Sequence, residues 1–216
     1  MKQLFLIIII FISTPICCFS QIDFDDYLKA VELNNSALKE IKSNNHQKAI
    51  SLLTDAIKID STLRNAYITL NQACVNENDQ LILKAYLTKA VTIFTDDDEL
   101  FYYLGNLYRK ENQVDSAIQY YSKAIELSKI NGEDYPIVYA YYLNRGICYL
   151  DKESPVQALQ DFNYGITLNP KNAALYTNKG NLLYQLGNTN QACTQWQMAV
   201  KLGCSDAESS YSKYCK

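Results

Sequence analysis

Cysteine and histidine are the residues of this chain whose side chains could carry redox, nucleophilic or metal-binding chemistry. The chain has seven cysteines but only one histidine, His46, in the polar stretch Asn44–Gln47. A single histidine with no cysteine or carboxylate cluster beside it offers too few ligands for zinc and cannot complete a Ser-His-Asp triad. No Cys-x-x-Cys pair and no glycine-rich phosphate loop is present. We therefore expect no catalytic residue, no metal site and no cofactor, and we interpret His46 as a solvated turn residue.

The acidic run Asp96–Glu99 could supply carboxylates to a calcium ion. It lacks the alternating spacing and the central glycine of an EF-hand loop. Negative charge is also favourable in the first turn of a helix, because it interacts with the positive end of the helix dipole. We expect these carboxylates to cap a helix that begins near Asp98.

Three cysteines are grouped near the C-terminus. Cys193 and Cys215 are each eleven residues from Cys204, which lies at an expected turn. If the helices on either side of that turn pack antiparallel, Cys193 and Cys215 fall at the same height, and we predict a disulfide between them. The alternative is a pair of buried free thiols, because cysteine packs as a small hydrophobic residue. Cys74 and Cys148 stand among apolar neighbours inside expected helices and are predicted to be core.

The first twenty residues have the pattern of a secretory signal peptide. Lys2 supplies a positive charge, and Leu4–Ile12 is an unbroken apolar run that is too short to span a bilayer as a stable anchor. Cys18–Ser20 then places small residues at the positions that a signal peptidase recognises, before Gln21. We predict that residues 1–20 are removed and that the protein is exported, to the periplasm, to the outer membrane or out of the cell. No transmembrane segment is expected after cleavage.

Two alternatives for this segment stay open. One is a short membrane anchor. The other is lipidation at Cys17 or Cys18, although Thr14–Ile16 lacks the small residues that lipoprotein processing favours.

The overall composition excludes some classes of function and fold. The formal net charge is −3 with 20% charged residues, whereas nucleic-acid binding needs a basic patch that neutralises phosphates. Seven glycines and four prolines are few for an all-β chain with many tight turns. The composition therefore favours a helical protein that does not bind nucleic acid.

A 34-residue period runs through most of the chain. The stretch Tyr142–Tyr149 aligns with Tyr176–Leu183 at this offset, and Phe162 aligns with Trp196. The period defines five units, with an N-terminal segment at 21–29 before them and seven extra residues, 132–138, after the third. The units are 30–63, 64–97, 98–131, 139–172 and 173–206. The insertion either lengthens a helix and its loop or bends the array.

Each unit is expected to form two helices. In the third unit, apolar residues recur at spacings of three and four before and after the polar break Lys110–Gln113. Small residues let two antiparallel helices approach closely. The pairs that would do so are Gly105/Ala117, Gly146/Ala158 and Gly180/Ala192.

This pattern resembles the tetratricopeptide repeat (TPR) family, and in particular small exported TPR proteins of Gram-negative bacteria. The last two units match best, and the second is degenerate because Asn71 and Leu83 replace the expected small residues. The resemblance implies an all-α, right-handed α-solenoid of about five helical hairpins. A capping helix at 206–216, started by a Ser205–Glu208 capping box, is expected to close its C-terminal end.

The resemblance also implies a concave groove, lined by the first helix of each unit, that binds peptides, loops or helices of other proteins. One TPR subclass clamps a C-terminal carboxylate there, but Asn34 and Leu38 stand where that clamp needs lysine and asparagine. We expect the partner to contact the inward stripe of the third to fifth units. Its residues are Tyr102, Asn106, Arg109, Lys110, Leu143, Ile147, Asp151, Thr177, Asn181 and Gln185.

The sequence therefore predicts an exported protein-interaction module, a scaffold or assembly adaptor of the cell envelope, rather than an enzyme. Two alternatives remain. A structural protein could self-associate as a homo-oligomer through the ends of its array, and a redox protein could use its thiols if one were exposed beside a basic group.

Overall fold

The computed structural model describes residues 24–215, so the predicted signal peptide, with Cys17 and Cys18, lies outside the described part. Within this range the fold is all-α. The helices are α1 (Phe24–Lys42), α2 (His46–Ile59), α3 (Arg64–Ala73), α4 (Gln80–Ile93), α5 (Asp98–Lys110), α6 (Val114–Asn131), α7 (Val138–Asp151), α8 (Pro155–Leu168), α9 (Ala173–Gln185), α10 (Thr189–Lys201) and α11 (Ser205–Tyr214), with a short 3-10 helix η1 (Glu77–Asp79) before α4. None of the described helices is long and apolar enough to cross a membrane.

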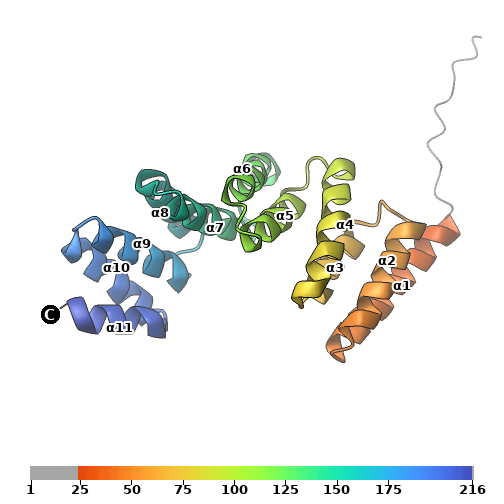
Figure 1. Cartoon of the computed structure of the whole chain (residues 1–216), viewed down its shortest axis with the longest axis horizontal. Coiled ribbons are helices and arrows are strands. Elements are labelled where there is room, and N and C mark those ends of the chain that lie inside the picture. The colour runs from red at the N-terminus through yellow and green to blue at the C-terminus, as the bar shows by residue number, and fades with distance from the viewer. Residues whose placement is uncertain (1–23, 216) are drawn as a thin grey trace, which may run out of the picture.

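The helices form an α-solenoid, as the sequence predicts. They pack in consecutive pairs, and the pairs follow one another along the long axis of the molecule, from α1 and α2 at one end to α11 at the other (Figure 1). Each predicted 34-residue unit corresponds to one such pair, although α1 already begins at Phe24, in the segment expected before the first unit, and α7 begins at Val138, the last residue of the predicted insertion. Neighbouring pairs bury each other's apolar faces, which is how repeat proteins obtain a continuous core.

A glycine in the first helix of a pair makes room for a large aromatic ring on the second helix. A Cβ atom added at Gly146 would lie 2.6 Å from Phe162, and one at Gly180 would lie 2.7 Å from Trp196. Gly105 faces Tyr121 in the same way. The alanines that the sequence analysis paired with these glycines are fully buried, but the atoms nearest to each glycine belong to the aromatic ring. The 34-residue period therefore places glycine against an aromatic ring in three successive units.

We expect the substitution Gly146→Val to lower the free energy of unfolding by about 1–3 kcal/mol, because it forces extra methyl groups into a filled core. Urea denaturation would measure the loss. Phe162→Leu alone and the double variant Gly146→Val/Phe162→Leu complete a double-mutant cycle. Leucine at position 162 leaves more room for the added valine, so the double variant should lose less stability than the sum of the two single losses. Strictly additive losses would contradict the proposed contact.

The second unit departs from the others at the end of its first helix. α3 has 10 residues, whereas the first helices of the other units have 13 to 19. Cys74 is buried directly after the end of α3 rather than inside a first helix, as the sequence analysis had placed it. The chain then runs through η1 into α4. The early end of α3 leaves part of α5 uncovered.

α6 is longer than the second helices of the other units, and the inserted residues 132–138 follow it as a loop that ends at the first residue of α7. α6 continues to Asn131, and Gly132 ends it with a φ of 116°, in the left-handed region that favours glycine. Glu133 then accepts hydrogen bonds from the hydroxyls of Tyr142, at 2.7 Å, and Tyr164, at 2.5 Å. The loop is therefore tied to both helices of the fourth unit.

α11 covers the open side of the last repeat. Its single fully buried residue is Ala207, and the ring of Tyr214 lies against Trp196 and Tyr184, with centroid distances of 5.9 and 4.4 Å. The predicted Ser205–Glu208 capping box is wrong. The N-cap residue is Cys204, Ser205 is already helical, and no side chain caps the helix.

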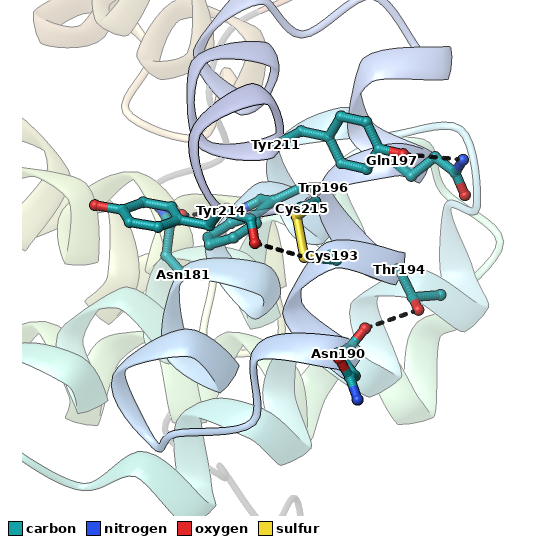
Figure 2. Close-up of a disulfide and its surroundings, with 9 residues drawn as sticks. All are labelled: Asn181, Asn190, Cys193, Thr194, Trp196, Gln197, Tyr211, Tyr214 and Cys215. Atoms are coloured by element: carbon teal, nitrogen blue, oxygen red, sulfur yellow. Dashed lines mark hydrogen bonds between the residues drawn. A yellow bond between two sulfur atoms is a disulfide. The ribbon is translucent and has the colours of Figure 1, made fainter.

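Cys193 of α10 and Cys215 after α11 form a disulfide in the structure, with a Cα–Cα distance of 5.5 Å (Figure 2). The two helices run antiparallel around the turn at Gly203, which has a φ of 88°. The bond joins the end of the capping helix to the hairpin that it covers.

Candidate interaction groove

Two adjoining cavities open between the junction of α3 and α4 and the last turns of α5. The inner cavity, of about 550 Å³, is bounded by Asn71 and Gln80 on one side and by Tyr102, Asn106 and Arg109 on the other. The outer cavity, of about 700 Å³, lies between Leu81 and Glu111. Both cavities share Val75, Gln80, Leu107 and Lys110 as lining residues, so together they form one groove.

The early end of α3 produces this groove. Cys74 takes a non-helical conformation after Ala73, and Cys74, Val75 and Gln80, which follow α3, line the inner cavity opposite residues of α5. Leu107 is buried, but it still lines both cavities together with Lys110. The groove therefore lies beside the degenerate second unit.

Four of the ten residues predicted to contact a partner meet in the wall of the inner cavity. They are Tyr102, Asn106, Arg109 and Lys110 of α5. Leu143 and Ile147 of the next unit line neither cavity and are partly buried against the core around Phe162, so their contact with a partner stays a prediction. Asp151 is exposed at the end of α7 and lines neither cavity.

The predicted residues of the fifth unit line neither cavity, and two of them form hydrogen bonds within the unit or with the turn that follows it. Thr177 donates to the Ala173 carbonyl at 3.0 Å and to Cys204 Sγ at 3.3 Å. Asn181 accepts a hydrogen bond from Trp196 Nε1 at 2.8 Å, and Gln185 is exposed at the end of α9. Contact of these residues with a partner stays a prediction.

The amides of Asn106 and Asn181 hold aromatic side chains in place. Tyr121 donates to Asn106 Oδ1 at 2.8 Å, in the same way that Trp196 donates to Asn181 Oδ1. In both cases the asparagine directly follows the packed glycine and the ring lies fifteen residues later. That spacing is visible in the sequence, but the sequence analysis treated both amides only as ligand contacts.

A hydrogen-bonded network stiffens the floor of the inner cavity. Asn144 Nδ2 donates to Asn106 Oδ1 at 3.0 Å and to the hydroxyl oxygen of Tyr102 at 3.2 Å. Burial raises the pKa of Tyr102, so its hydroxyl stays protonated at neutral pH. Because this oxygen already accepts from Asn144, its own proton is available to a ligand.

Arg109 brings an uncompensated positive charge to this floor. Its side chain is half-buried, it forms no ion pair with any residue in 24–215, and its Nε is enclosed without a hydrogen-bond partner. Burial raises the pKa values of Tyr121 and Cys148, and the nearby charge of Arg109 offsets part of that rise. Tyr121 and Cys148, which lie near Arg109, are therefore uncharged at neutral pH.

The two cavities differ in charge. No aspartate or glutamate lines the inner cavity, which contains Arg109 and Lys110. The outer cavity contains Glu77 and Glu111, and Glu111 accepts from Lys84 Nζ at 2.5 Å. Its rim is apolar, because Leu81 is 76% exposed and Val75 is 57% exposed. The groove thus has a cationic inner end and an apolar rim.

Other candidates from the sequence have structural roles. Asp97 caps α5 by accepting from the Leu100 amide at 3.2 Å, which confirms the capping role predicted for the acidic run. Arg64 pairs with both Asp97 and Glu99. His46 is the first residue of α2 and is half-buried, so its interpretation as a solvated turn residue is wrong. Over residues 24–215 no group of three potential ligands is arranged to hold a metal ion.

The unpaired thiols of the repeat core are poorly suited to redox chemistry. Burial raises the pKa of Cys74 to about 12 and that of Cys148 to about 11. The thiolate is the reactive form of cysteine, so both are almost wholly unreactive at neutral pH. Cys204 is half-buried beside the hydroxyl of Thr177.

Alkylation tests this assignment. We expect iodoacetamide at neutral pH to modify Cys204 in the folded, non-reduced protein and to leave Cys74 and Cys148 unmodified, because their thiols are buried and protonated. Peptide mapping by mass spectrometry would locate the label. In denaturant all three should react. Rapid labelling of Cys74 or Cys148 in the folded chain would show that the core thiols are accessible.

Comparison with known proteins identifies the repeat. A family model described as "Tetratricopeptide repeat" matches residues 99–129, within the third unit. A 123-residue segment is 32% identical to UDP-N-acetylglucosamine--peptide N-acetylglucosaminyltransferase of Giardia intestinalis, covering 57% of this chain and 8% of that protein. A 115-residue segment is 33% identical to Serine/threonine-protein phosphatase T of Trypanosoma brucei brucei, covering 52% of this chain and 22% of that protein. The chain thus spans less than a quarter of the length of these two relatives.

Several solved structures share the fold over most of both chains. Pseudomonas aeruginosa pilF has a TM-score of 0.73 and 16% identity, covering 88% of this chain and 90% of its own. MamA has a TM-score of 0.67 and 18% identity, with 87% and 96% covered. YrrB, described as a TPR protein with an unusual peptide-binding site, has a TM-score of 0.64 and 22% identity, with 87% and 97% covered. At these identities the likeness shows the fold.

Proposed function

Because the chain is a tetratricopeptide repeat protein, we propose that it is a non-catalytic interaction module that holds a segment of another protein in the groove between α3–α4 and α5. The groove itself is the observation that carries the proposal. It joins an exposed apolar rim at Val75 and Leu81 to a polar floor stiffened by Asn106 and Asn144. Interfaces of this kind obtain affinity from apolar contacts and orientation from a few fixed polar groups.

The proposal places the module in the cell envelope as a scaffold or assembly adaptor. The support is the signal-like pattern of residues 1–20 and the Cys193–Cys215 pair, because disulfides persist in exported proteins. Mass spectrometry of the natural N-terminus tests it. A chain that starts at Gln21 with an intact disulfide agrees with export, whereas an uncleaved chain with reduced cysteines contradicts it.

Comparative pull-down from the native source tests the groove. The bait is the full chain, alone and with Leu81→Glu in the rim. The matched control is Gln119→Glu, at an exposed position of α6 that lines neither cavity. We expect a partner that wild type and Gln119→Glu retain and that Leu81→Glu loses. A partner that all three baits retain equally would place binding elsewhere.

Self-association is a second candidate, and one observation favours it. The first turns of α1 expose apolar side chains at the N-terminal end of the array, with Phe24 70% exposed and Tyr27 and Leu28 also exposed. An uncapped end of a repeat array can pack against a second copy. Light scattering after size exclusion decides this, since a monomeric mass across the micromolar range would remove the candidate.

A further inference from the structure

We infer that the inner cavity recognises the carboxylate of an aspartate or glutamate side chain, carried by a partner segment whose neighbouring apolar residue contacts the outer rim. The inference rests on the proposed function and adds the chemistry of the ligand. Its centre is Arg109, with Lys110, Tyr102 and Gln80 as further polar groups in the cavity.

Arg109 differs from the other arginines of the chain in its partners. The chain has three arginines. Arg64 is bound by Asp97 and Glu99, and Arg145 is bound by both oxygens of Asp161, at 2.9 and 2.7 Å. Arg109 has no carboxylate partner within residues 24–215, although it is half-buried. A charge in a partly desolvated position is costly unless it is paired, so this guanidinium is prepared to bind an anion.

The position of Arg109 near the C-terminal end of α5 does not explain why its Nε lacks a hydrogen-bond partner. The C-terminal end of a helix attracts cations, because its last carbonyls are unpaired. Here backbone amides already satisfy those carbonyls. Glu111 N donates to Leu107 O at 3.0 Å, and Gln113 N donates to Tyr108 O at 2.9 Å. The enclosed Nε of Arg109 forms no hydrogen bond with these carbonyls or with any other group of the described chain.

The other polar groups of the cavity complement a peptide that carries a carboxylate. The Tyr102 hydroxyl has a proton to donate, as described above. Gln80 donates its Nε2 to the carbonyls of Cys74 and Asn76, at 3.1 and 3.2 Å, which fixes the amide. Its Oε1 is enclosed without a hydrogen-bond partner. The cavity thus offers hydrogen-bond donors from Tyr102 and Lys110 to an anion.

The groove favours an internal acidic residue over a chain terminus. The inner and outer cavities share four lining residues, so a segment can pass from one into the other. The carboxylates of Glu77 and Glu111 in the outer cavity repel a second acid there, whereas Val75 and Leu81 offer apolar contact. An apolar residue in the outer cavity next to an acidic residue in the inner cavity satisfies both environments.

Binding of peptide pools to the full chain tests the inference. The probes are fluorescent, N-acetylated and C-amidated octapeptide pools with a fixed leucine followed by a fixed glutamate, glutamine or lysine, plus a pool whose only acid is a free C-terminus. We expect wild type to bind the glutamate pool about tenfold or more tightly than the glutamine pool, as a charge-assisted hydrogen bond provides. Added salt should weaken this preference.

Variants separate the carboxylate site from the groove. Arg109→Gln should remove the preference for glutamate while keeping the weak binding of the glutamine pool. Lys123→Gln, at a partly exposed position of α6 that lines neither cavity, should change neither. If Arg109→Gln does not fold, as judged by circular dichroism, Lys110→Gln serves in its place, since Lys110 is exposed, and a weaker preference is expected.

Failure of the inference differs from failure of the proposed function. If wild type binds no pool, groove binding itself is overturned. If it binds the glutamine pool as tightly as the glutamate pool, if Arg109→Gln keeps the preference, or if the free C-terminus is preferred, the carboxylate assignment is overturned and groove binding stands.

Discussion

Replacing Asp161 by alanine is expected to lower the free energy of unfolding by about 2–4 kcal/mol, because it leaves the mostly enclosed guanidinium of Arg145, whose side chain is 18% exposed, without its counter-ion. Asp161 is 5% exposed and accepts two hydrogen bonds from Arg145. Arg145 Nη1 also donates to Ser122 Oγ at 3.0 Å. This pair therefore joins α6, α7 and α8, and its loss should loosen the contact between the third and fourth units.

An exposed ion pair in the same region is the matched control. Asp115 lies 2.9 Å from Lys152 Nζ, and its side chain is 76% exposed. Water and salt screen such a pair, so Asp115→Ala should cost less than about 1 kcal/mol. Urea denaturation of both variants measures the difference. Similar losses for Asp115→Ala and Asp161→Ala would show that the Arg145–Asp161 pair contributes no more to the free energy of unfolding than an exposed ion pair does.

The second large effect is a loss of stability at high pH, where we expect the protein to unfold as its buried tyrosines lose their protons. Burial raises the pKa of Tyr67 to about 12. Tyr141 and Tyr142 have pKa values raised further above the ordinary range, first by burial and then by hydrogen bonds to Asp98 and Glu133. In the unfolded chain a tyrosine loses its proton near pH 10.

The sign of the pH dependence follows from proton binding. Above about pH 10 the unfolded state binds fewer protons than the folded state, so stability that is complete below this pH falls as the pH rises. Near-ultraviolet absorbance of tyrosinate, followed together with helical circular dichroism, measures the effect. We expect exposed tyrosines to titrate first and the buried ones to titrate together with loss of helix.

One variant identifies a residue involved. Tyr141 is fully buried, so Tyr141→Phe should reduce the late phase. A single phase near pH 10 with the helices intact would contradict this account.

The sequence was sufficient for the architecture, because the fold depends on a spacing that repeats. Glycine and a large aromatic residue recur in the same register in the last three units, and each pair is a direct contact in the structure. The disulfide between Cys193 and Cys215 followed from the same kind of argument, since two antiparallel helices bring equally spaced residues together.

The candidate site was predicted only in part, because it depends on where one helix ends. The inward positions of α5 were found, but nothing in the 34-residue pattern showed that α3 ends at Ala73 and opens a groove beside them. The repeat pattern predicts Asn181 as a ligand contact, whereas in the structure it accepts a hydrogen bond from Trp196. The Arg145–Asp161 pair was missed because it lies across a hairpin, at positions where the other units carry uncharged residues or no matching pair.

The most direct test of the central claim is photo-crosslinking in the native source from two positions of the full chain. A photoreactive residue at Leu81 stands on the rim of the groove, and one at Gln119 stands on the exposed surface of α6. We expect one partner protein to crosslink from Leu81 and not from Gln119, and we expect Arg109→Gln to weaken this crosslink. Equal crosslinking from both positions, or crosslinking from Gln119 alone, would contradict it.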